Sequence, residues 1–189
     1  MFEQFLDAYR LTASGGGQEV PDSVHPVLAP LFSQLGGSTF DDGLYRVHTP
    51  TSAAVIDGYV VDAFPELDGR VACFGFDWLG QQWAIDTGSG TPDDPHILLL
   101  NPNTGEVSPF PVAFSRFHDD VLVDIKDLGE RHLGEWAAEY PGQLPLAFDE
   151  CVGNAVPIFI GGDDSFENMR KQNLQVLWGT HSQILGQLR

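Results

Sequence analysis

One cluster of residues in this chain has the types that a nucleophilic enzyme needs. Ser115, His118 and either Asp119 or Asp120 would supply a nucleophile, a base and an orienting carboxylate. They lie within about one helical turn of each other, and no strained strand-to-helix turn precedes the serine. We therefore interpret them as one solvated face of a helix and expect no nucleophile triad.

Two acidic clusters have side chains that could bind a metal ion. His118-Asp119-Asp120 is one, and Asp163-Asp164 with Glu167 is the other. Neither follows the ligand order of a calcium loop or of a zinc-binding helix. The run 161–164, two glycines and two aspartates, resembles a phosphate loop but lacks its Lys-Ser/Thr pair. We expect a turn and a helix cap there, with no metal and no cofactor.

Carboxylates also occur in pairs along the chain, as in glycoside hydrolases. The five acidic doublets are Asp41-Asp42, Asp93-Asp94, Asp119-Asp120, Asp149-Glu150 and Asp163-Asp164. All fall in expected loops, helix ends or polar faces, which is typical of surface charge rather than of one buried pair. Asp77 and Asp86 lie among aromatic residues, which is the apolar setting that a tuned acid needs. We expect no enzyme; a small hydrolase using these two and His118 is the alternative.

The charge of the chain restricts its partners. It has 27 acidic and 9 basic residues, a formal net charge of −18. Nucleic-acid affinity comes largely from cations that neutralise phosphates, so we expect neither nucleic acid nor a membrane as partner. The charge favours a basic protein, although acidity that serves solubility alone is the competing interpretation.

The cysteines and the chain start favour a cytoplasmic protein. Cys73 and Cys151 are far apart in apolar contexts, as expected for buried thiols in a reducing compartment. Residues 1–7 have neither a basic region nor a long apolar run, so they do not read as a signal peptide. No apolar run approaches the roughly 20 residues of a membrane span.

The pattern of apolar residues predicts an α+β domain. Helices are expected at 2–9, 22–35, 51–64, 114–120, 128–140 and 180–188, with a short one from Asp163 or Asp164 to Met169. Strands are expected at 44–48, 70–76, 82–87, 97–100, 106–108, 156–160 and 174–178. This order predicts a mainly antiparallel sheet flanked by helices. We expect a single domain over 1–189, with an N-terminal helix and Gly-rich loop in 1–22 and the main body in 23–189.

Several stretches match a known family in order and spacing. They are 43–46 (GLYR), 63–65 (AFP), 73–86 (CFGFDWLGQQWAID), 98–106 (LLLNPNTGE), Phe117-His118 and 149–162 (DECVGNAVPIFIGG). Over about residues 24–188 the chain resembles the GAD-like and type VI DNase-immunity families of bacteria. Members of these families are often encoded beside polymorphic toxins, many of them nucleases, and neutralise them by direct binding.

The resemblance implies an immunity protein that occludes a cognate toxin, preferably a secreted DNase. A regulatory scaffold without a toxin is a second alternative. Asn154 stands where the family pattern has an aromatic or basic residue, so we expect the surface near that turn to suit a different toxin.

Residue roles follow from these interpretations. We expect Trp83 and Phe159 to be core residues. The residues expected to contact the partner are Asp41, Asp42, Asp93, Asp94, Asp119, Asp120, Asp163 and Asp164. The signature residues expected to be structural are Gly75, Asp77, Trp78, Gly80, Trp83, Asp86, Gly153, Pro157, Gly161 and Gly162.

Overall fold

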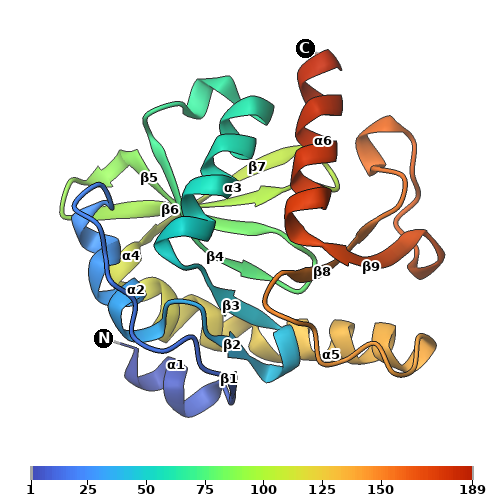
Figure 1. Ribbon diagram of the computed structural model, residues 1–189, viewed down its shortest axis with the longest axis horizontal. Helices are drawn as coiled ribbons and strands as arrows, with labels where there is room; N and C mark the ends of the chain where they lie inside the picture. Colours follow the sequence, from blue (N-terminus) through green and yellow to red (C-terminus); the bar gives the residue numbers. More distant parts are fainter. Residues whose placement is uncertain (1, 189) are drawn as a thin grey trace.

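The computed structural model describes residues 2–188, and an antiparallel sheet forms the centre of this part of the chain. Each of the seven strands in this sheet pairs with the next along the sequence (Figure 1). They are β1 (Leu11–Ala13), β2 (Thr39–Phe40), β3 (Tyr45–Val47), β4 (Val71–Asp77), β5 (Gln82–Thr91), β6 (Asp94–Asn101) and β7 (Glu106–Ala113). A second, two-stranded sheet contains β8 (Glu150–Asn154) and β9 (Met169–Asn173). The expected α+β class is confirmed.

Helices cover both faces of the central sheet. The α-helices are α1 (Glu3–Ala8), α2 (Ala29–Leu35), α3 (Pro50–Ala63), α4 (Phe114–Arg116), α5 (Val123–Glu139) and α6 (Leu174–Leu188). A π-helical turn, η4 (Phe117–Leu122), joins α4 to α5, and the 3-10 turns are η1 (Pro26–Leu28), η2 (Asp41–Gly43), η3 (Pro65–Leu67), η5 (Ile158–Ile160) and η6 (Phe166–Asn168). In Figure 1, α3 and α6 lie in front of the sheet and α5 lies behind it. None of the described helices combines the length and apolarity needed to cross a membrane.

Apolar side chains alternate between the two faces of the central strands and contribute to a separate core on each face of the sheet. Trp83 and Ile85 of β5 belong to the core beneath α1, α2 and α5, whereas Ala84 between them belongs to the core beneath α3 and α6. Ile97 and Leu98 of β6 divide in the same way. Successive side chains of a strand point to opposite faces, so these two strands contribute to both cores.

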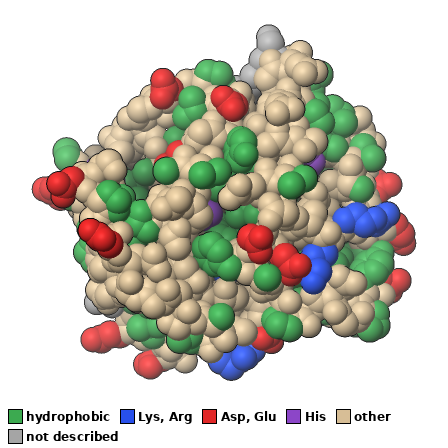
Figure 2. Space-filling model, viewed as in Figure 1, with side chains coloured by type: hydrophobic (Ala, Val, Ile, Leu, Met, Phe, Trp, Pro, Cys, Tyr) green, Lys and Arg blue, Asp and Glu red, His purple; other side chains and the backbone are tan. Residues whose placement is uncertain are grey.

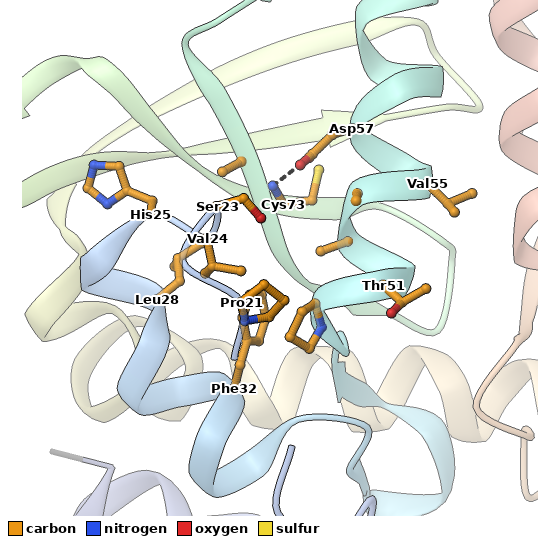
Figure 3. A pocket seen from close by; sticks show the side chains of 14 residues that line it. Pro21, Ser23, Val24, His25, Leu28, Phe32, Thr51, Val55, Asp57 and Cys73 are labelled. Carbon is orange, nitrogen blue, oxygen red and sulfur yellow. Dashed lines mark hydrogen bonds between the residues drawn. The ribbon is translucent and has the colours of Figure 1, made fainter. Parts of the chain in front are cut away.

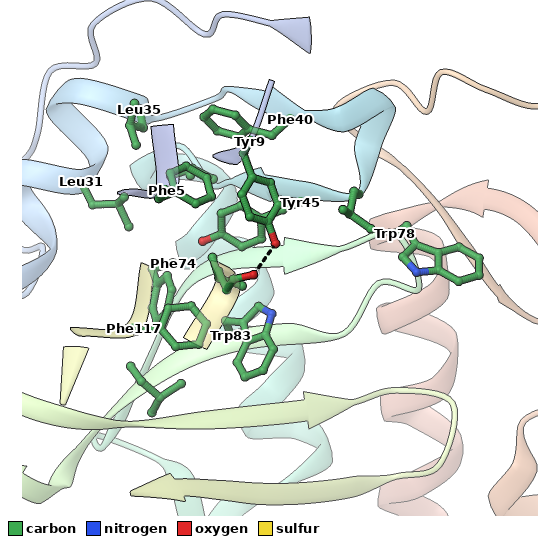
Figure 4. Packing of buried hydrophobic residues seen from close by; sticks show 14 of the residues in the cluster. Phe5, Tyr9, Leu31, Leu35, Phe40, Tyr45, Phe74, Trp78, Trp83 and Phe117 are labelled. Atoms are coloured by element: carbon green, nitrogen blue, oxygen red, sulfur yellow. Dashed lines mark hydrogen bonds between the residues drawn. The ribbon is translucent and has the colours of Figure 1, made fainter. Parts of the chain in front are cut away.

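The N-terminal helix is part of the larger core. Phe5 packs against the rings of Tyr9, Phe40 and Tyr45 at centroid distances of 4.6, 4.8 and 5.7 Å (Figure 4). The Tyr9 hydroxyl donates to the carbonyl oxygen of Leu122 at 2.8 Å. Residues 3–13 therefore pack into the body through α1 and β1, although the sequence suggested a boundary near residue 22.

One buried cation joins the sheet to the C-terminal part of the chain. Arg46 of β3 is fully buried, and its guanidinium donates to the carbonyl oxygens of Ala147, Glu150 and Asp77, the first and last at 3.0 and 2.9 Å. It also lies over the Phe76 ring, 4.5 Å from the centroid. Loss of hydration lowers its pKa to about 10, so it stays charged at neutral pH.

The expected strand at 174–178 is wrong, because this segment begins α6. Leu174, Leu177 and Trp178 are buried on one side of that helix, and Leu185 continues the same stripe. The spacing of these residues is helical, but an apolar run this short also fits a buried strand, so the sequence pattern alone did not distinguish the two.

The expected strand at 156–160 is also wrong, and the expected short helix ending at Met169 is reduced to the 3-10 turn η6. Pro157 has no N–H for a sheet ladder, and the residues after it form the single turn η5. The strand lies earlier, at β8, and pairs with β9, which begins at Met169. Phe159 is consequently only partly buried, at the edge of the core beneath α6, and not in a strand.

Trp83 is 4% exposed, which confirms its expected place in the core. We predict that Trp83→Ala will lower the free energy of unfolding by about 3–5 kcal/mol, because it leaves a large cavity. Phe159→Ala should cost less, roughly 1–2 kcal/mol, because less apolar area leaves water there. Urea unfolding of both variants measures the difference. An unchanged unfolding midpoint for Trp83→Ala would contradict the assignment.

Candidate partner-binding surface

The acidic doublet at 41–42 is bound to nearby cations. The Nη2 atom of Arg10 lies 2.8 Å from Oδ2 of Asp42, and Nζ of Lys126 lies 3.4 Å from Oδ2 of Asp41. Asp42 also donates its backbone N–H to the hydroxyl of Thr12. This doublet joins β1, η2 and α5, which is a structural task that its sequence context did not reveal.

The doublet at 119–120 is similarly engaged. Asp119 accepts hydrogen bonds from the backbone N–H groups of Phe2 and Phe5, at 3.0 and 3.1 Å, and so caps the start of α1. Asp120 accepts from Nε of Arg116 at 2.6 Å. Acidic residues expected to face a partner therefore hold the N-terminal helix in place.

The remaining two expected doublets each have one freely exposed member. Asp94 accepts from the N–H and hydroxyl of Ser115, at 2.9 and 2.7 Å, whereas Asp93 is exposed in the β5–β6 turn. Asp163 and Asp164 are both exposed, and Asp163 accepts from the hydroxyl of Ser165 at 2.7 Å. Ser115 precedes the Arg116–Asp120 pair, so the doublets at 93–94 and 119–120 lie near each other.

Carboxylates are spread over the face shown in Figure 2 and do not form one dense patch. The five ion-paired cations among the described residues are Arg10, Arg70, Arg116, Lys126 and Lys171. Arg46 is buried. Because these cations are already engaged by the protein itself, the acidic surplus faces solvent.

The residues of the hydrolase alternative do not form one site. Asp86 makes a bidentate pair with Arg70, with contacts of 2.8 and 3.0 Å. It lies opposite Val71 at the start of β4, whereas Asp77 ends that strand, roughly 20 Å away at ~3.3 Å per residue. The two carboxylates cannot act on one bond.

His118, the third residue of that alternative, is enclosed by aromatic rings. Its Nε2 atom lies 3.0 Å from the hydroxyl of Tyr45, and its Nδ1 atom has no partner among the described residues. Burial lowers its pKa to about 3, so the ring is neutral and packs as a core side chain. Within residues 2–188, no three His, Cys, Asp or Glu side chains gather as a metal site would require.

Several signature residues shape the β4–β5 hairpin. Oδ1 of Asp77 accepts from the N–H groups of Leu79 and Gln81, both at 2.9 Å, and Gly80 has a φ of 74°. A carboxylate that bonds backbone groups two and four residues ahead stabilises a tight turn. The side chain of Trp78 in this turn is 2% exposed.

The signature residues near the C-terminal turn have a similar role. The carbonyl oxygen of Pro157 accepts from the N–H groups of Ile160 and Gly162, and Gly161 has a φ of 98°. Asn154 is 3% exposed and its backbone N–H donates to Oδ1 of Asn103, so its own side chain adds almost nothing to the surface near that turn.

An apolar groove of about 290 Å³, here called the α5 groove, lies between α5 and the sheet. Its lining includes Asp77, Trp78, Trp83, Phe110, Ile125 and Leu128. Figure 4 shows Trp83 beside Tyr45, which also lines the groove, with Trp78 farther along the same side of the sheet. The groove brings together residues from β4, β5, β7 and α5, which are far apart in sequence.

The groove has an acidic rim and an exposed apolar edge. Leu128 is 60% exposed and Ile125 is 38% exposed, both on α5. The acidic residues Asp124, Asp127 and Glu130 alternate with them along the helix and are exposed. The sequence predicted a helix that begins at Leu128, so it did not indicate this surface. The pattern that could have revealed it is the apolar stripe on α5, which is wider than the buried residues of the helix require.

A second cavity of about 500 Å³ lies between the 21–32 segment and α3 (Figure 3). Asp57 in its lining accepts from the N–H of Cys73 at 2.7 Å, where β3 no longer pairs with β4. Burial raises the pKa of Asp57 to about 6. This carboxylate satisfies an edge N–H of the sheet, which is a structural role.

No protein-family model and no curated protein matches the sequence. Among solved structures, the chain is similar to the crystal structure of Atu4351 from Agrobacterium tumefaciens, with 15% sequence identity and a TM-score of 0.60. The match covers 97% of this chain and 89% of that chain. At this identity, the likeness shows a shared fold alone.

Burial raises the pKa of Asp77 from 3.8 to about 7, and the Arg46 guanidinium opposes part of that rise. Between these pH values the folded state binds the proton more tightly than the unfolded state, so this group's stabilisation falls as the pH rises through about 4 to 7. We predict that Asp77→Asn, which stays neutral, will melt higher than the wild type at pH 8.

That advantage should be a few degrees, since one kcal/mol shifts the melting temperature by about 2–4 °C at this chain length. Below pH 4 it should disappear. Calorimetric melting of both proteins across this range is the measurement, and a constant difference at every pH would show that ionisation of Asp77 is not the cause.

Proposed function

We propose that this chain is an immunity-type protein that binds and neutralises a cognate bacterial toxin with a basic surface, a secreted DNase of a type VI system. The observation that carries the proposal is the unneutralised acidic surface. The net charge is −18, and ion pairs within the chain already engage five of its cations. Such a surface attracts a cationic protein and repels nucleic acid.

The family resemblance supports the same proposal. Its stretch at 73–86 spans β4, the hairpin turn and the first half of β5, and its stretch at 43–46 includes the buried Arg46. These residues build the scaffold, and immunity specificity would then depend on side chains around it. The exposed side of α5, outside the best-matched stretches, is suited to that role.

The proposed mechanism is stoichiometric occlusion. A DNase needs a basic cleft to hold its polyanionic substrate. An acidic protein of complementary charge can occupy that cleft, and the field between the two speeds their encounter. Neutralisation of this kind requires no bond chemistry and no metal from the inhibitor. The protein would act in the cytoplasm, where a toxin of this class meets its DNA.

The test uses the basic toxin domain encoded beside the gene of this chain. One equivalent of the chain should abolish DNA cleavage and form a 1:1 complex in size-exclusion chromatography. A domain that is neither bound nor inhibited would refute the proposed function.

We predict that association will be steered by charge. Between 50 and 500 mM salt, the stopped-flow association rate should fall by about tenfold or more, with little change in dissociation, because the Debye length shrinks below about 8 Å. Whichever of Asp93→Lys and Asp164→Lys lies at the interface should lower the association rate below that of the wild type at the same salt concentration. Both side chains are exposed, so neither change breaks the bonds of Asp94 or Asp163. If neither salt nor these charge reversals changes the association rate, the acidic surface serves solubility alone.

A further inference from the structure

The α5 groove combines exposed apolar side chains with a carboxylate in its wall. Leu128 and Ile125 line the groove while remaining 60% and 38% exposed. Trp83 and Phe110 continue the apolar lining, with their rings 5.3 Å apart. Apolar side chains that line one concave surface mark an interaction site more strongly than the same side chains scattered singly.

Asp77 lines this groove and uses one of its two carboxylate oxygens within the hairpin turn. Its Oδ1 atom is engaged by the N–H groups of Leu79 and Gln81, while its Oδ2 atom accepts no hydrogen bond from any described residue. The Arg46 guanidinium bonds the backbone carbonyl of Asp77 and leaves the carboxylate open. Above its pKa of about 7 the carboxylate is ionised and only accepts, so the group that completes it there must donate a hydrogen bond.

The charges around the groove favour a cationic group. Asp124, Asp127 and Glu130 are exposed on α5. The cation in the lining, Lys126, is 16% exposed and bound to Asp41 and Glu130. The other titratable side chain in the lining, besides Asp77 and two tyrosines, is His132, whose ring meets Trp78 edge-on at 5.2 Å. Arg131 is also exposed on α5, and the three carboxylates outnumber it and Lys126, so the side chains around the groove carry net negative charge.

The volume and the sheet edge narrow the choice of occupant. About 290 Å³ lies just below the roughly 300–1,000 Å³ of small-ligand pockets, which suits one or two protein side chains. Strand addition to β7 is disfavoured, because Pro109 and Pro111 remove N–H donors from that edge.

We infer that the α5 groove is the docking place for a cationic segment of the toxin. An Arg or Lys of that segment lays its aliphatic stem along the half-buried Phe110 and directs its donors to Oδ2 of Asp77. An apolar neighbour in the segment covers Ile125 and Leu128. The inference rests on the proposed function for the identity of the partner, and it adds the place and chemistry of the contact.

The first experiment measures affinity for the toxin domain by titration calorimetry. Leu128→Asp should weaken binding by about tenfold or more, because it places a charge in the desolvated contact. Asp77→Asn should have a comparable effect by removing one partner of a buried charge pair. Val176→Asp is the matched control, since Val176 is 59% exposed but lies on α6, across the sheet. Its affinity should change less than about twofold.

A second experiment tests the groove without the toxin. In NMR titrations, n-butylguanidinium should shift the amide signals of Leu79 and Gln81, whose N–H groups bond Asp77, and the neutral n-butylurea should not. The shifts should be lost in Asp77→Asn. Both ligands carry the same stem, so the comparison isolates the cationic head.

The outcomes separate the inference from the proposed function. If the wild type does not bind the toxin domain, the proposed function fails, and the butylguanidinium titration still tests the groove. If the wild type binds and Leu128→Asp binds equally well, the toxin docks elsewhere and the inference fails alone. Equal shifts with both small ligands, or none with either, would also overturn it.

Discussion

The architecture depends on one buried cation. Arg46 donates to three carbonyl oxygens from parts of the chain that no sheet ladder joins, namely Ala147, Glu150 and Asp77. Burying a guanidinium is costly, and it is tolerated here because Nη1 and Nη2 donate to carbonyl oxygens and its face meets the Phe76 ring, although Nε has no partner among the described residues. The same contacts fix the end of β4, and with it the position of the Asp77 carboxylate at the α5 groove.

The arrangement of charge explains how a strongly acidic chain stays folded. Several carboxylates are bound within the protein and so do not simply repel one another. Asp119 caps α1, Asp41 forms an ion pair with Lys126, and Asp86 forms an ion pair with Arg70. Ion pairs among the described residues engage five of the nine cations. What remains outside is acidic, and it surrounds an apolar groove. In the proposed complex, charge on this surface would speed association and the neighbouring apolar groove would slow dissociation.

Sequence patterns predicted the α+β class and the run of strands from 70 to 108, because β-branched and aromatic alternation marks strands joined by tight turns. They failed at 174–178, where an apolar run of five residues fits a strand and a helix equally well. They also failed for the acidic doublets, since no local pattern shows that Asp119 meets the N-terminus of α1. The groove was beyond reach, because Asp77, Phe110 and Leu128 become neighbours only after the sheet forms.

The central claim is that this fold presents the α5 side of its sheet to a basic protein partner. Amide hydrogen exchange of the chain, free and mixed with the toxin domain proposed as its partner, tests it most directly. The account predicts slower exchange on binding in residues 78–83 and 121–132, with α3 and α6 unchanged. Protection confined to α3 and α6, with the α5 side exchanging as in the free protein, would contradict it.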